Sequence, residues 1–175
     1  PPGKGFLAEV VRDWEAAATP AATAGIRVVS LRFGVVLSPR GGALAKMLPA
    51  FRLGLGGKLG NGRQFWSWIA LDDLVAAVRH SLRTEALRGP VNVVSPSPAT
   101  NAEFTQALGR VLHRPVFCTV PAFALKLAFG EMGREALLSS CRVAPNRLRQ
   151  TGFQFQWPDL TPALKHYLAP AAKLS

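Results

Sequence analysis

Cysteines, acidic residues and long apolar runs are all scarce in this sequence, and each shortage excludes a class of protein. The only two cysteines, Cys118 and Cys141, form neither a CxxC pair nor a four-ligand zinc pattern. We therefore predict buried free thiols in a reducing compartment, and a cytoplasmic location. The richest apolar stretch, Pro121 to Gly130, contains Lys126 and is shorter than the ~20 apolar residues that span a bilayer. We expect no membrane partner.

The shortage of acidic residues leaves the chain strongly basic. Ten Asp and Glu residues stand against 21 Lys and Arg residues, a formal net charge of +11. Such a charge raises the affinity for phosphates of any kind. The basic residues are scattered, with a mild concentration at Arg142, Arg147 and Arg149, and no nucleic-acid-binding motif occurs. We therefore do not expect sequence-directed nucleic-acid binding.

Metal-binding and hydrolase patterns are missing as well. His80, His113 and His166 are widely separated and lack carboxylate or cysteine partners at ligand spacing, so we predict no metal site. No serine lies in a G-x-S-x-G context, which excludes a hydrolase nucleophile of that kind.

The first part of the chain has the pattern of a βαβ unit. Phe6, Val10 and Trp14 recur at helical spacing with charges between them, which predicts a helix over 6–18 with one buried face. The run 26–33 is rich in β-branched residues and predicts a strand. Helix, short link and apolar strand indicate a mainly parallel sheet.

Further helices and strands alternate along the rest of the chain. Asp72 and Asp73 open a predicted helix, where their carboxylates can satisfy free amides. Thr100 and Glu103 have the spacing of a capping box. The predicted helices are 43–53, 74–82, 104–112, 122–129, 131–140 and 160–167, and the predicted strands or short extended elements are 64–69, 90–94, 116–120 and 153–155. The class is mixed α/β.

The glycines from Gly54 to Gly60 follow a helix rather than a strand. No G-x-G-x-x-G occurs at a strand-to-helix junction, so a pyrophosphate cradle is not predicted there. A flexible loop is the better interpretation.

Many segments match one family in order along the chain. They are Phe6–Ala17, Leu31–Ala43, Phe51–Gly57, Gly60–Gln64, Trp68–Leu74, Thr100–Phe104, Phe129–Met132, Arg142–Leu148 and Gly152–Phe155. Together they resemble the second half of an extended short-chain dehydrogenase/reductase of the epimerase family, with its carboxyl-terminal domain of unknown function.

The resemblance implies a fold and a division of the chain. The fold would be the carboxyl-terminal part of a Rossmann-like α/β fold with a small mixed α/β substrate-side lobe. Residues 1–95 would complete the Rossmann-like domain with substrate-side segments, and residues 96–175 would form the family's carboxyl-terminal domain. More chain is then expected ahead of Pro1.

The resemblance implies NADP or NAD as cofactor of the longer protein, held by a glycine-rich loop that lies before this chain. Family members also use a Tyr-x-x-x-Lys pair for proton exchange. Here the single tyrosine is Tyr167, and Phe6 and Val10 stand at the positions of the pair. Glu9 or Glu15 could replace the acid, although solvated or capping roles explain both side chains. We therefore assign no catalytic residue.

Two segments are predicted to border the site by resemblance. The cofactor wall is Arg32, Phe33, Gly34, Val35 and Val36, where the end of a parallel strand would pass the nicotinamide and Gly34 would permit close approach. A central core strand is the alternative role for this segment.

The substrate wall is Gln64, Trp66 and Trp68, which alternate onto one face of an extended segment. A buried aromatic face packed on the carboxyl-terminal helices explains them equally. Trp66 stands where related epimerases place a diphosphate-binding arginine.

The sequence leaves two hypotheses for function. One is a fragment of an NAD(P)-binding epimerase- or dehydratase-like oxidoreductase that acts on a small-molecule substrate. The alternative is a non-catalytic binding or regulatory protein that keeps the fold. Substrate and oligomeric state are left open.

Overall fold

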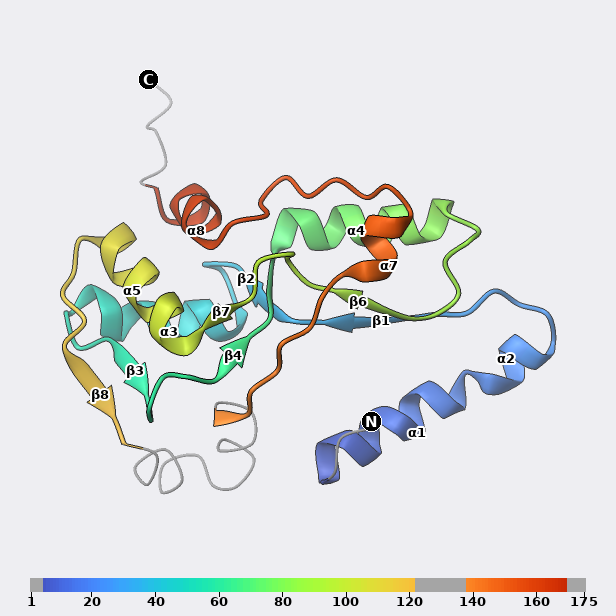
Figure 1. The fold of residues 1–175 in the computed structure, drawn as a ribbon, viewed down its shortest axis with the longest axis horizontal. Coiled ribbons are helices and arrows are strands. Elements are labelled where there is room, and N and C mark those ends of the chain that lie inside the picture. The colour runs from blue at the N-terminus through green and yellow to red at the C-terminus, as the bar shows by residue number, and fades with distance from the viewer. Residues whose placement is uncertain (1–4, 122–137, 170–175) are drawn as a thin grey trace.

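The computed structural model describes residues 5–121 and 138–169, which form a mixed α/β fold (Figure 1). The predicted helix 122–129 and most of the predicted helix 131–140 lie outside the described residues. Within the part described, no helix is long and apolar enough to cross a membrane.

Within residues 5–121 and 138–169 the strands form four two-stranded pairs, and three of these are parallel, as predicted. The parallel pairs are β1 (Val29–Phe33) with β6 (Gly89–Val93), β2 (Val35–Leu37) with β5 (Trp68–Ala70), and β3 (Gly57–Leu59) with β8 (Cys118–Val120). The antiparallel pair is β4 (Phe65–Trp66) with β7 (Ala99–Thr100).

The helices lie on both sides of these strands. They are α1 (Phe6–Ala17), α2 (Thr19–Thr23), α3 (Gly42–Arg52), α4 (Leu71–Arg83), α5 (Asn101–Leu112), α7 (Asn146–Gln150) and α8 (Leu160–Leu168). In Figure 1, α4 lies above the β1–β6 pair and α1 lies below it. The sequence did not predict α7, because a helix of 5 residues is too short to show a periodic pattern. The extended element predicted at 153–155 is an irregular segment.

The predicted capping box at the start of α5 is confirmed. The Thr100 hydroxyl accepts from the Glu103 amide at 3.2 Å, and the Glu103 carboxylate accepts from the Thr100 amide at 2.7 Å. Two backbone amides that the helix itself cannot pair are thereby satisfied.

The prediction that α1 buries one face is wrong for this structure. Phe6 is 70% exposed and Trp14 is 73% exposed. The periodic apolar positions are present, but no described element packs over them. An amphipathic pattern shows which face can be buried and not what covers it.

The buried apolar residues form two clusters. One gathers residues of β2, β5, α3, α5 and α8, among them Leu37, Trp68 and Phe104. The other lies between the β1–β6 pair, α4 and the region of α7, with Val91 and Leu148. Both clusters combine residues from before and after position 95, and the predicted division at 95/96 stays a prediction.

The two carboxylates at the start of α4 do not act as local caps, contrary to expectation. Asp73 is 1% exposed, and its carboxylate accepts from the amides of Gln156 at 2.7 Å and Trp157 at 2.9 Å. Asp72 accepts from the Tyr167 hydroxyl at 3.1 Å, and that hydroxyl accepts from the Asp72 amide. Both carboxylates therefore hold the segment that leads into α8 and α8 itself.

Candidate functional site

The cofactor wall lies where the chain passes from one strand pair to another. Arg32 and Phe33 end β1, which pairs with β6, whereas Val35 and Val36 begin β2, which pairs with β5. The Gly34 amide donates to the Val93 carbonyl at 3.4 Å, and the Val35 amide donates to the Ser67 carbonyl at 2.8 Å. The backbone changes partner within these two residues.

Gly34 is required here by the close approach of two backbones. A Cβ atom on this residue would lie 2.4 Å from the Ser67 carbonyl oxygen and 3.0 Å from a Val94 methyl group. Any side chain would push β2 away from β5. The sequence predicted close approach to a cofactor at Gly34, and this contact with Ser67 by itself explains the glycine.

Arg32 has a partner that the sequence did not predict. Its guanidinium donates two hydrogen bonds of 2.6 Å to the two carboxylate oxygens of Glu15. These bonds lower the pKa of the Glu15 carboxyl and raise the pKa of Arg32. The expectation of a solvated or capping Glu15 is therefore corrected: the residue ties α1 to the end of β1. A bidentate pair of this kind fixes direction as well as distance.

Phe33 presents the one large apolar side chain of the cofactor wall to solvent. It is 53% exposed at the carboxyl end of the parallel β1–β6 pair. In open α/β sheets, ligands bind outside the carboxyl ends of the strands.

All three residues of the substrate wall are buried. Gln64 and Trp66 are each 7% exposed, and Trp68 is fully buried. The Trp66 ring lies 5.4 Å from the ring of Phe104 in α5, and the Trp68 indole donates to the Ser97 carbonyl at 2.8 Å. The packed aromatic face considered as the alternative role is thus present, and a contact with substrate stays a prediction.

The structure brings the cofactor and substrate walls together. Val35 is the register partner of Trp68, and Val36 is the partner of Ile69. Segments about 30 residues apart in the sequence thereby run side by side as parallel strands.

A later segment, residues 140–143, runs beside the substrate-wall strand. The Ser67 hydroxyl donates to the Cys141 carbonyl at 2.8 Å and accepts from the Val143 amide at 2.9 Å. The Phe65 amide donates to the Ser140 hydroxyl at 3.1 Å, and the Cys141 amide donates to the Phe65 carbonyl at 2.9 Å. We define this set of bonds as the 65–141 seam. Nothing in the pattern of residues 140–143 signals it.

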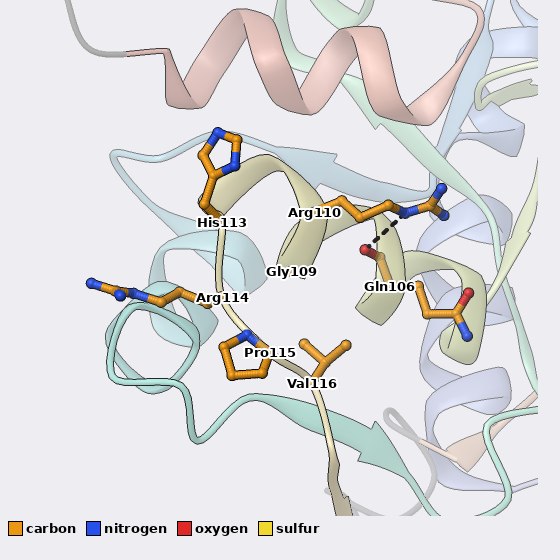
Figure 2. A pocket seen from close by; sticks show the side chains of 7 residues that line it. All are labelled: Gln106, Gly109, Arg110, His113, Arg114, Pro115 and Val116. Atoms are coloured by element: carbon orange, nitrogen blue, oxygen red, sulfur yellow. Dashed lines mark hydrogen bonds between the residues drawn. The ribbon is translucent and has the colours of Figure 1, made fainter.

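Two cavities open near these elements. One, of about 400 Å³, adjoins the substrate wall and is lined by Gly60, Asn61, Arg63, Gln64, Leu138 and Ser140. The other, of about 560 Å³, lies at the carboxyl end of α5 (Figure 2). In Figure 2 the side chains of Arg110, His113 and Arg114 point away from one another around Gly109, Pro115 and Val116. This second cavity includes no residue of either wall.

The remaining titratable groups give no sign of a metal centre. No group of three His, Cys, Asp or Glu side chains suited to a metal ion occurs within the described ranges. Cys118 and Cys141 are free thiols, as predicted, but both are exposed, which corrects the expectation of burial. Cys118 lies in β8 and Cys141 in the 65–141 seam.

The single tyrosine is occupied away from both walls. Tyr167 in α8 bonds to Asp72, and burial raises the pKa of its phenol. His166 contacts the same carboxylate at 3.2 Å and stacks on Trp157 with ring centroids 4.4 Å apart. These contacts join α8 to α4.

Comparison with known proteins gives one domain family and a set of closely similar relatives. The family described as a domain of unknown function (DUF1731) matches residues 120–167. The chain is 49% identical over 162 residues to the epimerase family protein Mb2239 of Mycobacterium bovis, covering 93% of this chain and 54% of that protein.

Solved structures of epimerase family proteins are also similar to this chain. Human epimerase family protein SDR39U1 (isoform 2), determined with NADPH, superimposes with a TM-score of 0.87 at 40% identity, over 94% of this chain and 55% of that chain. A nucleoside-diphosphate sugar epimerase from Corynebacterium glutamicum gives 0.72 at 38% identity, over 95% of this chain and 31% of that one. The chain belongs to the epimerase family of extended short-chain dehydrogenase/reductases, and it spans about half the length of the curated relatives that it matches.

Proposed function

We propose that this chain supplies the substrate-side half of an NAD(P)-dependent epimerase-type oxidoreductase, together with part of its nicotinamide pocket. The adjacency of the cofactor and substrate walls carries the proposal. The Val35 amide bonds to the Ser67 carbonyl at 2.8 Å, and Val35 lies opposite Trp68 in the register. Residues predicted to border cofactor and substrate therefore occupy neighbouring strands.

The residues of the cofactor wall suit NADP or NAD. Phe33 offers an exposed apolar ring at the carboxyl end of a parallel strand pair, where a flat nicotinamide ring can pack. The bound cofactor would exchange a hydride with the substrate. The presence of NADPH in the human relative's structure supports this assignment.

The chain's own residues would orient and shield the reacting groups. The Arg32–Glu15 pair sets the position of α1 relative to the end of β1. Gly34 lets β2 lie close to β5. The buried indoles of Trp66 in β4 and Trp68 in β5 pack these strands firmly into the core. A stiff wall keeps water out and limits the orientations of a bound ligand.

Exposed apolar side chains on and near α1 and β1 support a position for the additional half that the relatives contain. Phe6 and Trp14 of α1, Ile26 ahead of β1 and Phe33 of β1 are between 53% and 73% exposed, and such apolar side chains can be covered by a further part of a protein. The relatives are nearly twice as long as the matched segment. We propose that the additional half of the family's fold covers α1 and β1 and contributes the pyrophosphate loop.

The cofactor assignment is tested by calorimetric titration with NADPH and NADH. The chain would be joined to the amino-terminal half of its Mycobacterium bovis relative, and Phe33→Ala would be compared with Phe117→Ala. Phe117 is 90% exposed and lies far along the chain in the segment before β8. Loss of ring packing, worth about 1 kcal/mol, should weaken binding roughly fivefold in Phe33→Ala only. Absence of saturable binding, or equal effects of both variants, would refute the assignment.

A non-catalytic binding or regulatory role is the second candidate, and the state of Tyr167 favours it. Phe6 and Val10 cannot ionise, and burial together with the bond to Asp72 keeps Tyr167 in its neutral form. Following the absorbance of the reduced nicotinamide with sugar and carbonyl substrates separates the two candidates. Any substrate-dependent hydride transfer by the joined protein would exclude the non-catalytic role.

A further inference from the structure

We propose that the cavity beside Gln64 binds an oxyanion, the carboxylate or phosphate group at the remote end of the substrate. That the ligand is a substrate rests on the proposed function. The cavity and its preference for anions are argued from the geometry of its own residues. We call this cavity the Arg63 pocket; its lining is Gly60, Asn61, Arg63, Gln64, Leu138 and Ser140.

The walls of the Arg63 pocket are held in place before any ligand binds. One wall is the 60–64 loop and the other is the segment 138–140, and the 65–141 seam joins them through the bond from the Phe65 amide to the Ser140 hydroxyl. The two segments are about 75 residues apart in sequence. A pocket whose walls are already joined loses little entropy when a ligand enters.

The loop itself is fixed by bonds to neighbouring elements. The Gly60 amide donates to the Val120 carbonyl and the Ala102 amide donates to the Gly62 carbonyl, both at 2.9 Å. The Gln64 side chain donates to the Leu59 carbonyl at 3.1 Å. Gly62 has a φ of 72°, which favours glycine, and a Cβ atom there would make a tight contact of 3.1 Å with that of Ala102. The loop therefore presents Arg63 at one place on the rim.

The polar groups of the pocket are mostly hydrogen-bond donors. The Asn61 carbonyl oxygen already accepts from the Arg63 amide at 2.9 Å, which leaves its NH₂ group to donate. The Ser140 oxygen accepts from Phe65, which leaves its hydroxyl proton to donate. Among the described residues, the Arg63 guanidinium makes no ion pair with a carboxylate, and none of those that line the pocket is Asp or Glu.

A pocket whose described lining is rich in hydrogen-bond donors, with a guanidinium and no carboxylate among them, fits a ligand that only accepts hydrogen bonds. Carboxylates and phosphates meet this condition and match the planar fork of arginine. The volume of about 400 Å³ admits a head group with a few further atoms. Leu138 supplies an apolar surface for a carbon segment next to that head group.

The distance to the cofactor wall sets how the ligand would lie. Trp68, which pairs with Val35, lies four positions after Gln64. An extended strand rises about 3.3 Å per residue, so Gln64 lies at most about 13 Å from Trp68, and the cofactor wall is one strand spacing of about 4.8 Å further across. The pocket would then hold the non-reacting end of an elongated substrate. Binding energy at a remote group of this kind orients the reacting carbon.

The test is an NMR titration of the isotope-labelled full chain with inorganic phosphate and with acetate, at constant ionic strength adjusted with chloride. We expect saturable shifts of the backbone amides from Gly60 to Gln64 and of Ser140. Arg63→Gln should weaken binding about tenfold, whereas Arg63→Lys should retain part of it. Arg52→Gln is the matched control, since Arg52 is an exposed arginine at the end of α3.

Saturation by phosphate alone would assign a phosphate head group, and saturation by acetate would assign a carboxylate. Shifts that fail to saturate, or that are the same in Arg63→Gln, would overturn the proposal. The titration contains no nicotinamide. A protein that binds phosphate at Arg63 but fails to bind NADPH would refute the proposed function and leave the oxyanion pocket in place. A protein that binds NADPH but neither phosphate nor acetate would refute the pocket and leave the proposed function in place.

Discussion

The two sides of the molecule contain the same kind of amphipathic helix but differ in what covers it. On one side, α5 sets Phe104 against Trp66 in the larger buried cluster, and Phe104 is 1% exposed. On the other side, α1 leaves Trp14 73% exposed, and the Arg32–Glu15 pair holds its carboxyl-terminal half to β1. The uncovered side is where the proposal expects the rest of the family's fold.

The largest effect should come from comparing two tryptophans, one on each side. Trp68→Ala removes a fully buried indole and its bond to Ser97, and should cost about 3–5 kcal/mol of unfolding free energy. Trp14→Ala removes an exposed indole and should change stability by less than about 0.5 kcal/mol. Urea unfolding of the chain measures both. Similar losses in the two variants would contradict the difference in cover.

The next effect concerns the link between α4 and the segment before α8. Asp73→Ala removes the buried carboxylate that accepts from the amides of Gln156 and Trp157, at a cost of about 1–3 kcal/mol. Hydrogen exchange should speed up at those two amides more than in α1. Asp159→Ala is a suitable control, because the Asp159 carboxylate accepts an exposed hydrogen bond from the Ser97 hydroxyl rather than from the two amides. Unchanged exchange at 156 and 157 would show that the carboxylate does not hold this segment.

A smaller effect is expected at the start of α5. Thr100→Ala should destabilise the chain by about 1 kcal/mol through loss of the cap. The bonds from Thr100 lower the pKa of the Glu103 carboxyl, so the contribution of Glu103 is present above its ordinary pKa and is lost as the pH falls through the lowered value. Chemical unfolding across the acidic range should show a shallower loss in Thr100→Ala than in the parent. An identical pH dependence would mean that the cap is not linked to this titration.

The smallest effect should occur on the uncovered side. Glu15→Gln removes the charge that pairs with Arg32, and an exposed pair of this kind is worth about 0–1 kcal/mol. The guanidinium lowers the pKa of Glu15, so this contribution too is lost as the pH falls below the ordinary carboxyl range. Amide exchange in α1 is the sensitive measurement, with Glu9→Gln as control. Equal exchange in both variants would show that Glu15 does not anchor the helix.

Local signals in the sequence predicted most of the elements correctly. The strands at 29–33 and 89–93, the helices α3, α4, α5 and α8, and the Thr100–Glu103 box each follow from residues within one or two turns of one another. The family resemblance is also confirmed. The roles of the cofactor and substrate walls stay predictions, since no contact within the chain tests them.

The sequence did not predict where the charged and thiol side chains would lie. Glu15 was expected to be solvated or part of a capping network, but its carboxylate pairs with Arg32. Asp73 was expected to cap its own helix, but its carboxylate accepts from the Gln156 amide. The two thiols were expected to be buried, but both are exposed. Each outcome depends on a neighbour that a local pattern does not contain.

The sequence by itself determined which segments become helices and strands, that the sheet is mainly parallel, and that no Tyr-x-x-x-Lys pair is present. These properties depend on periodicity, caps and composition, which act over a few residues. Only the tertiary structure decided that Val35 lies beside Trp68, that Asp73 reaches a segment 83 residues away, and that α1 is left uncovered. The reason is that burial and pairing depend on which distant segments meet, whereas helix and strand formation depends on near neighbours.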